Sequence, residues 1–459
     1  MSLRLLRAAI AGAAERLAAE AVTVADRIWE YAEQPFQEFR SSALIREVLS
    51  RHGFVVKQEF SKIPTAFAMS AGGGGPRIGI LAEYDALPDC GLDEGTWGHG
   101  CGHHLLGAGS LLAALVARDV MRSRRPRGTI VLYGCPAEET LAGKVYMARD
   151  GAFGDLDAAL AWHPGGHIRV EAGGGAALNT YAFEFFGKTA HGASAHHGRS
   201  ALDAVELMDH AVNILREHIP ENVRIHSVIT CGGSAPNVVP EYARSWLFVR
   251  GQDRKQVEEI SARVLRCARG AAVATETRSK ATLLTAVYER LPNDRLAEHL
   301  HTCLKQMGPP AFDDRDRRAL RRVLLKAAGR DKKAKVELPT KIEEIDKNRG
   351  RASSDQDNVS WLAPLAALQM ACSPKGITGH HRDTTRVGRS SAAHKGTIQA
   401  GKVLALAAVS LAGDPNLRAR VRREFRRRTK DFTYDPVIPR RQLPPIGDRI
   451  PAAPPAPPQ

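Results

Sequence analysis

The stretch Gly98-His99-Gly100-Cys101-Gly102-His103-His104 combines a cysteine and several histidines with glycines, directly ahead of an apolar, helix-like run at residues 105–116. Glycine lets the backbone bend sharply, so side chains two positions apart can turn toward one ion. Thiolate and imidazole groups are common ligands of zinc in proteins. The stretch therefore indicates a metal site, and a glycine-rich loop with a buried free cysteine is the structural alternative.

Three further ligand-type signals follow at wide spacing, namely the pair Glu138-Glu139, His163, and the pair His380-His381. Each of them follows an apolar or small-residue segment that is typical of a strand. In a parallel sheet, side chains at the carboxyl ends of the strands meet at one edge. The spacing therefore predicts an α/β fold with the ligands gathered at this edge.

Carboxylates stand at two of the predicted strand ends. Asp85 follows the strand-like run at residues 78–82, where it can orient a metal-binding histidine. A turn-capping role for Asp85 is the alternative. Two adjacent carboxylates such as Glu138 and Glu139 are costly to hold together without a cation. In a metal hydrolase, one of them can bind the metal while its neighbour removes a proton from water.

The net charge of +15 is concentrated in two segments of the 459-residue chain. Residues 313–351 carry a net charge of +6 and residues 416–459 carry +7, which leaves about +2 for the rest. Neither segment interleaves aromatic and basic residues as a groove for single strands does. We therefore expect solvated surfaces there and no nucleic-acid partner.

Several features of the composition favour a cytoplasmic protein. No continuous apolar run approaches 18 residues, so we expect no transmembrane helix and no membrane partner. Acidic residues interrupt the N-terminal alanines and leucines, which predicts an amphipathic helix, with an organellar transit peptide as the alternative. The seven cysteines are odd in number and widely spaced, as is typical of a reducing compartment.

The apolar periodicity changes near Gly173. Residues 176–288 alternate between strand and helix patterns in the order β-α-β-β-α-β, the split ferredoxin-like arrangement. We therefore predict a catalytic domain in two parts, 1–175 and 291–415, with an inserted α+β domain at 176–290. The charged segment 313–351 is an insertion in the second part, either an extra lobe or a loop. Residues 416–459 form a basic, proline-rich tail, which we expect to be extended or disordered from Leu417.

Five motifs follow one another along the chain: Tyr84-Asp85-Ala86-Leu87-Pro88, Gly98-His99-Gly100-Cys101-Gly102-His103, Pro136-Ala137-Glu138-Glu139, Trp162-His163-Pro164 and Ala393-His394-Lys395-Gly396. In this order they resemble the motifs of the di-metal aminoacylase/carboxypeptidase superfamily. The resemblance is closer to its amidohydrolase branch, which includes aminobenzoyl-glutamate hydrolases and auxin-conjugate hydrolases, and it covers about residues 22–311 and 352–412. The resemblance implies a zinc-peptidase-like α/β catalytic domain with an inserted ferredoxin-like lid and dimerisation domain.

The resemblance also implies a metal centre of two divalent ions, Zn²⁺ or Mn²⁺. Its implied ligands are Cys101, His103, Glu139, His163 and His380, with the Cys101 thiolate bridging the two ions. Glu138 matches the general base that activates the attacking water and then protonates the leaving amine. Asp85 is the residue expected to orient a ligating histidine.

Three positions of the inserted domain match substrate contacts of the family. His191 and Asn237 match positions that approach the substrate, and Arg250 matches a basic position that holds a substrate carboxylate. As structural alternatives, His191 is a loop histidine and Arg250 a surface residue of a strand.

These matches predict a metal-dependent amidohydrolase or peptidase that cleaves the amide bond of N-acyl or N-aminobenzoyl amino acids, or of small dipeptides. The family's habit also predicts a homodimer. The alternative is a catalytically inactive relative that binds an acyl-amino acid or serves as a partner subunit. Its support is the strongly polar stretch 382–389, where relatives commonly continue with an aromatic residue. His104 is a second departure, because many relatives have Asp or Asn there.

Overall fold

The computed structural model describes residues 3–60, 62–124, 127–325 and 336–446. In this part of the chain, one sheet has seven strands, in the order β1 (Val55–Glu59), β2 (Phe67–Gly73), β4 (Gly128–Gly134), β3 (Arg77–Ala82), β5 (Ala158–Gly165), β11 (Leu365–Ala371) and β6 (Arg169–Glu171). A second sheet has four strands, in the order β10 (Arg278–Val287), β7 (Ala177–Phe186), β9 (Tyr242–Gly251) and β8 (Arg224–Cys231).

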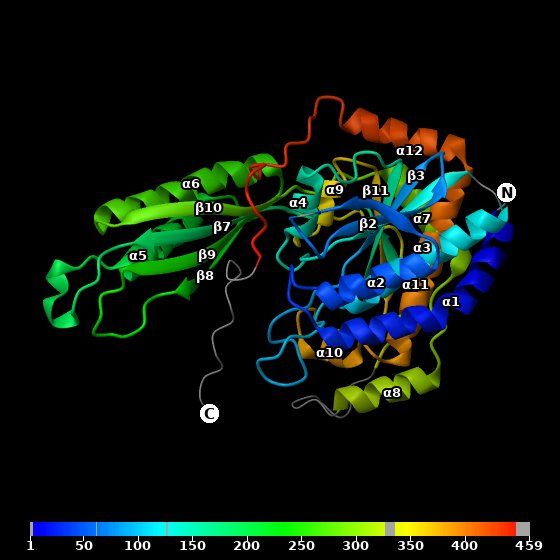
Figure 1. Ribbon diagram of the computed structural model, residues 1–459, viewed down its shortest axis with the longest axis horizontal. Helices are drawn as coiled ribbons and strands as arrows, with labels where there is room; N and C mark the ends of the chain where they lie inside the picture. The colour runs from blue at the N-terminus through cyan, green and yellow to red at the C-terminus, as the bar shows by residue number, and fades with distance from the viewer. Residues whose placement is uncertain (1–2, 61, 125–126, 326–335, 447–459) are drawn as a thin grey trace.

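The helices cover both sheets. They are α1 (Leu3–Tyr31), α2 (Phe39–Arg51), α3 (His103–Arg124), α4 (Gly143–Arg149), α5 (Ala201–Leu215), α6 (Arg254–Ala274), α7 (Asp294–Met307), α8 (Asp314–Leu325), α9 (Gln356–Val359), α10 (Arg382–Val387), α11 (Ser391–Gly413) and α12 (Pro415–Arg428), with short 3-10 turns η1 (Gly192–His197) and η2 (Arg216–His218). Figure 1 shows the four-stranded sheet and its two helices extending to the left of a larger body built on the seven-stranded sheet. The chain is an α/β protein, as the sequence predicted.

Four neighbouring strands of the larger sheet, β4, β3, β5 and β11, run parallel to one another. The flanking strands β1, β2 and β6 pair antiparallel. Because parallel strands end at the same edge, the segments that follow these four strands meet there. These segments carry the ligand-type residues that the sequence analysis singled out.

The central strands are buried on both faces, which explains their continuous apolar runs. Ile80 and Leu132 point into a core that they share with helices α1, α3 and α11. The next residues along each strand, Leu81 and Tyr133, point into a second core with α4 and residues 359–363. Successive side chains of a strand face opposite sides, so one strand serves both helical layers.

The four-stranded sheet is antiparallel and carries α5 and α6 on one face. Phe183 of β7 and Leu247 of β9 are buried in one core with Val205 of α5 and Val257 of α6. The elements follow the order β7, α5, β8, β9, α6, β10, so the predicted β-α-β-β-α-β order is confirmed. The domain boundaries 1–175, 176–290, 291–415 and 416–459 stay predictions.

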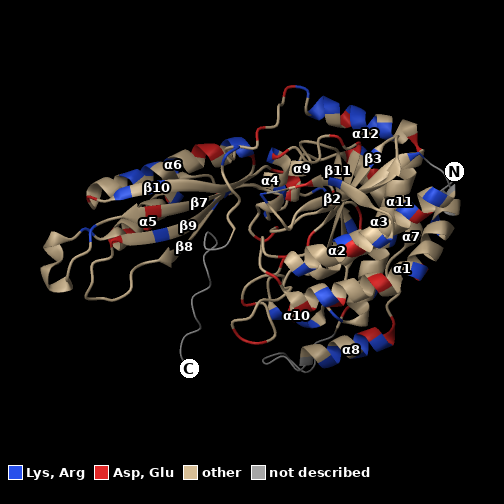
Figure 2. Ribbon diagram, viewed as in Figure 1, with Lys and Arg blue, Asp and Glu red and all other residues tan. Residues whose placement is uncertain are grey.

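The expectation of an extended or disordered tail from Leu417 is wrong for its first part, because α12 runs to Arg428. Asp414 caps this helix by accepting a hydrogen bond from the Leu417 N–H at 2.9 Å. Leu417 and Val421, four residues apart, bury one stripe of the helix. The high density of arginine, visible along α12 in Figure 2, obscured this short apolar stripe in the sequence.

The charged segment 313–351 contains one helix, α8, within its described residues. Residues 336–351 follow without a regular helix or strand. The backbone of Asp346 pairs with that of Glu171 of β6 in a single parallel β-bridge. Residues 326–335 of this segment and the proline-rich end at 451–458 lie outside the described residues.

Helices α3 and α11 have the length and composition of membrane spans. In the 18-residue apolar stretch of each helix, 89% of α3 and 83% of α11 is buried inside the fold. They pack against each other and against the seven-stranded sheet, as core helices do. The cytoplasmic location predicted from the sequence stays a prediction.

Candidate metal centre

The carboxyl edge of the parallel strands brings together the side chains predicted as ligands. Glu139 comes from the turn after β4, His163 from the end of β5, and His380 from the loop after β11. Cys101 lies in the loop before α3 and His103 is the first residue of α3, which packs against this sheet. Residues separated by up to 279 positions thereby face one another, since Cys101 and His380 stand in one cluster.

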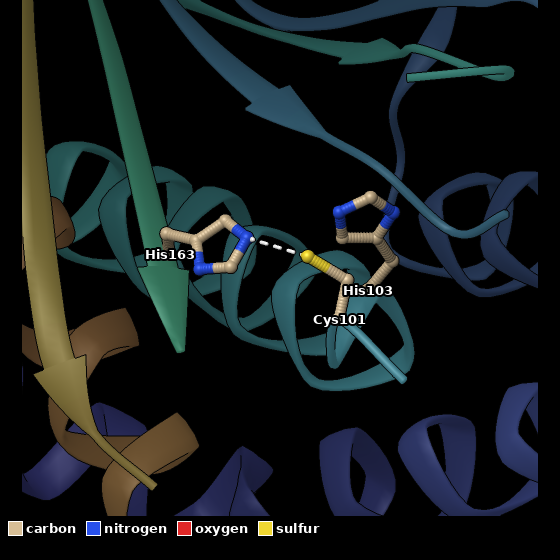
Figure 3. Close-up of side chains that lie close together, drawn as sticks. All are labelled: Cys101, His103 and His163. Atoms are coloured by element: carbon tan, nitrogen blue, oxygen red, sulfur yellow. Dashed lines mark hydrogen bonds between the residues drawn. The ribbon is translucent and has the colours of Figure 1, made fainter. Parts of the chain in front are cut away.

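The possible ligand atoms form three three-residue groups, and within each group they lie within 4.8 Å of one another. One group is Glu83, His103 and Glu138. The other two share Cys101 and are Cys101, His103 and His163, and Cys101, Glu139 and His380. Cys101 Sγ lies 3.3 Å from His163 Nε2 (Figure 3), and His380 Nε2 lies 3.5 Å from Glu139 Oε2. A residue common to both groups is what a bridging thiolate requires.

Hydrogen bonds on the far side of the imidazole rings fix which nitrogen faces the centre. His103 Nδ1–H donates to Asp85 Oδ1 at 2.7 Å, and the second oxygen of Asp85 accepts the Glu139 N–H at 2.8 Å. His163 Nδ1–H donates to the Pro164 carbonyl at 2.7 Å. In both histidines the Nε2 lone pair is therefore left for a ligand. Asp85 stands where the sequence analysis expected a carboxylate that orients a ligating histidine.

The residues present fit two divalent cations. His103 Nε2 and Glu139 Oε1 are buried and have no hydrogen-bond partner in the described part of the chain. Buried polar atoms without partners are costly, and a cation in the group of each residue would satisfy them. The Cys, His and Glu donors form a set that binds Zn²⁺ and also accommodates Mn²⁺.

The pKa shifts of the acidic groups at this place also favour a bound cation. Burial, followed by repulsion from Glu83 and Asp355, raises the pKa of Glu138 well above its ordinary value. Burial also raises the pKa of Glu139 to about 7 and raises the pKa of the Cys101 thiol. Positive charge at this place would favour the ionised forms of all three groups.

The sequence analysis missed three charged residues beside the centre. Lys144 is fully buried, and both its backbone N–H and its Nζ donate to Asp355. Its Nζ also lies 2.8 Å from Glu83 Oε1, while Glu83 Oε2 lies 3.5 Å from His103 Nε2. The position of Glu83 at the end of β3, two residues before Asp85, was a usable signal. Lys144 sits in a helix with no local pattern that marks a buried cation.

A cavity of about 530 Å³ opens beside the centre and includes Cys101, Glu138, Glu139, His163 and His380 in its wall. Arg250 of β9 also lines it. The Arg250 Nη1 donates to the Arg351 carbonyl at 3.3 Å, and its Nε is buried without a partner. Two other arginines of this wall, Arg169 and Arg290, are paired with Asp346 at 3.1 Å and Asp357 at 2.6 Å. In the described part of the chain, Arg250 is thus the arginine of this wall without a carboxylate partner.

His191 and Asn237 lie next to each other, because the Gly192 N–H donates to the Asn237 carbonyl at 2.7 Å. Both are exposed on the smaller body, and neither lines the cavity. Their substrate contacts stay predictions that require the two bodies to approach each other.

The polar stretch 382–389 directs its arginines away from the cavity. Arg386 pairs with Asp383 at 3.0 Å, and Arg389 pairs with Glu30 of α1 at 3.2 Å. None of these arginines lines the cavity that holds the centre. Other residues of the stretch, Thr384, Val387 and Gly388, line a second cavity whose wall also contains Cys101 and His163.

The chain is similar to a peptidase family and to known enzymes that hydrolyse amide bonds. The profile described as peptidase family M20/M25/M40 matches residues 79–351. The chain is 34% identical to one of the subunits of the p-aminobenzoyl-glutamate hydrolase of Escherichia coli (strain K12), over 92% of this chain and 95% of that protein. It is 27% identical to the Xaa-Arg dipeptidase of Mus musculus, over 90% of each chain.

Solved structures share the fold at lower identity. An aminobenzoyl-glutamate utilization protein from Klebsiella pneumoniae matches with a TM-score of 0.59 and 18% identity, over 88% of this chain and 98% of that one. The Bacillus subtilis YXEP protein, described as a dinuclear metal binding peptidase, matches with a TM-score of 0.57 and 16% identity, over 86% and 99% of the chains.

Proposed function

The chain belongs to peptidase family M20/M25/M40, and from this premise we propose that it hydrolyses the amide bond of N-acyl or N-aminobenzoyl amino acids, or of small dipeptides. The family and its named hydrolases establish a hydrolase that acts on amide bonds. The observation that carries the finer proposal is the pair of ligand groups that share Cys101 at the wall of a cavity containing Arg250.

The ions would be held by Cys101, His103 and His163 on one side and by Cys101, Glu139 and His380 on the other. Two divalent cations, Zn²⁺ or Mn²⁺, supply Lewis-acid polarisation of the amide carbonyl and lower the pKa of the attacking water when they are bound. The protein contributes the orientation of the ligands, in which Asp85 holds the His103 ring by the Nδ1–H bond.

Glu138 is the proposed general base. Its side chain lines the cavity, and its Oε2 lies 3.8 Å from His103 Nε2. The carboxylate would take a proton from water as the water attacks the amide carbon, and would later deliver that proton to the leaving amine.

Arg250 is proposed to bind the carboxylate of the amino-acid half. Replacing it by alanine should raise KM for an N-acyl amino acid by roughly 10- to 100-fold with a smaller change in kcat, because hydrogen bonds between charged groups contribute about 1.5–3 kcal/mol. The measurement is steady-state kinetics on an N-acyl amino acid and on its carboxamide. The carboxamide should be poor with wild type, and Arg250→Ala should lower its turnover little further. An equal loss on both substrates would contradict carboxylate recognition.

The homodimer predicted from the sequence suits one of the two edges of the smaller sheet, the edge formed by β8. Strand β8 is an edge strand, and its Val228 and Ile229 are 53% and 42% exposed. An open edge with apolar side chains can pair with a second copy. Light scattering should give the mass of two chains for wild type, and Val228→Lys should shift this mass toward one chain. A monomeric wild type would contradict the prediction.

The proposed function is tested by a substrate panel with metal-reconstituted wild type and Glu138→Gln as the control. The panel contains aminobenzoyl-glutamate, N-acetyl amino acids, indole-acyl amino acids and dipeptides. Turnover that is sensitive to chelators and absent from the control supports the proposal and ranks the substrates. Failure to turn over any of them, together with failure to bind metal, would favour the inactive relative.

A further inference from the structure

Glu38 is a buried carboxyl group that does not cap the helix it precedes. It precedes α2 at the N-cap position, yet its side chain makes no capping hydrogen bond there. Another carboxylate, Glu33, accepts the backbone N–H groups of Arg40 and Ser41 in the first turn of α2, each at 2.8 Å. The Glu38 side chain is fully buried and points elsewhere.

One oxygen of Glu38 accepts two backbone hydrogen bonds from different parts of the chain. Its Oε1 lies 2.9 Å from the Phe36 N and 2.9 Å from the Ala137 N. Both donors are non-glycine residues in the left-handed region, with φ of 64° at Phe36 and 56° at Ala137. Such conformations persist where the surroundings hold them, and here one carboxyl oxygen accepts a hydrogen bond from each.

Ala137 is the residue before the Glu138-Glu139 pair. Its carbonyl accepts the Thr140 hydroxyl at 3.1 Å and the Ala142 N–H at 3.3 Å, so the turn closes on Ala137. The backbone direction at Ala137 determines where the next two side chains point. Glu139 points to His380 and Glu138 points toward His103.

We propose that Glu38 is a positioning residue of the metal centre, which holds Ala137 in its left-handed conformation and thereby sets the places of the Glu138 and Glu139 carboxylates. The proposal rests on the proposed function only for the role of those carboxylates. It adds a residue about 100 positions upstream that touches neither metal nor substrate.

The chemistry of the site says which replacements are informative. The Glu38 Oε2 is buried and has no hydrogen-bond partner among the described residues, and burial together with Asp85 raises the pKa of Glu38 to about 8. Glutamine keeps the accepting oxygen and the shape, whereas methionine keeps a similar volume and accepts no hydrogen bond from Ala137. Glycine at position 137 adopts positive φ without strain and so has less need of the bond.

The experiment compares Glu38→Gln, Glu38→Met and the double variant Glu38→Met with Ala137→Gly, and Glu33→Met is the matched control. Zinc affinity of the metal-free protein, metal content, kcat, KM and thermal unfolding are measured for each. Glu38→Met should weaken zinc binding by about 10- to 100-fold and lower kcat with little change in KM, in line with other partners of metal ligands. Glu38→Gln should stay within about threefold of wild type.

The double variant should recover part of the zinc affinity, and Glu33→Met should lower the unfolding temperature with zinc affinity unchanged. Loss of stability alone in Glu38→Met, with normal zinc affinity, would overturn the proposal. A Glu38→Gln variant as weak as Glu38→Met would also overturn it. Because zinc affinity is read without substrate, this test stands even if the proposed substrates are wrong.

Discussion

Glu138→Gln is expected to lower kcat by about 10²–10⁴-fold while leaving the metal content unchanged, because general-base catalysis contributes on this scale. The amide matches the carboxyl group in shape but cannot take the proton of the attacking water. Glu138 belongs to neither of the two groups that contain Cys101, so its replacement removes none of their ligands, although it lies with Glu83 and His103 in the third group. The measurement is kcat on the best substrate of the panel together with metal analysis by mass spectrometry.

Glu139→Gln is the matched control for this prediction. It makes the same chemical change one residue along, in a side chain whose Oε2 lies 3.5 Å from His380 Nε2. It should lose metal as well as turnover. If Glu138→Gln kept full activity, or if it lost metal as readily as Glu139→Gln, the assignment of Glu138 as the general base would be wrong.

Cys101→Ala is expected to lose both ions and all measurable turnover. Cys101 is common to the two ligand groups, so the replacement leaves two protein ligands in each. The prediction is checked by metal content after dialysis and by zinc titration. Asp85→Asn gives a graded comparison, since loss of a partner of a metal ligand weakens binding by about 10- to 100-fold.

A cysteine away from the centre serves as the control. Cys303 is buried in α7 and belongs to neither ligand group. Cys303→Ala should lower stability by a modest core-packing amount and leave the metal content unchanged. Two ions retained in Cys101→Ala would contradict the bridging role, and one ion retained would assign Cys101 to a single site.

Local pattern was enough to predict the α/β fold and the cluster of ligand types. Strands of a parallel sheet are buried on both faces, so they read as apolar runs, and the residues after them must meet at one edge. This is why Glu139, His163 and His380 could be predicted to converge although they are far apart in sequence. The order of elements in the smaller sheet was predicted for the same kind of reason, from apolar periods of about 2 and 3.6.

The partners of buried charges could not be predicted in this way. Lys144 meets Asp355 across 211 positions, and Glu38 meets Ala137 across 99. Nothing in the sequence around either residue encodes such a partner, because a hydrogen bond between distant segments depends on the packing of the whole sheet. The helix at residues 415–428 was missed for a related reason, since two buried side chains stabilise it among many arginines.

The positions of His191 and Asn237 show the same division between local pattern and packing. Their motifs marked them as substrate contacts, yet they lie on the smaller body away from the cavity. A motif specifies the chemistry of a side chain, and the relative placement of two bodies specifies what that side chain can reach. The residue types of the candidate ligands and their order along the chain could therefore be predicted from the sequence. Their hydrogen-bond supports and the approach of the inserted residues depend on contacts that form only when the chain is folded.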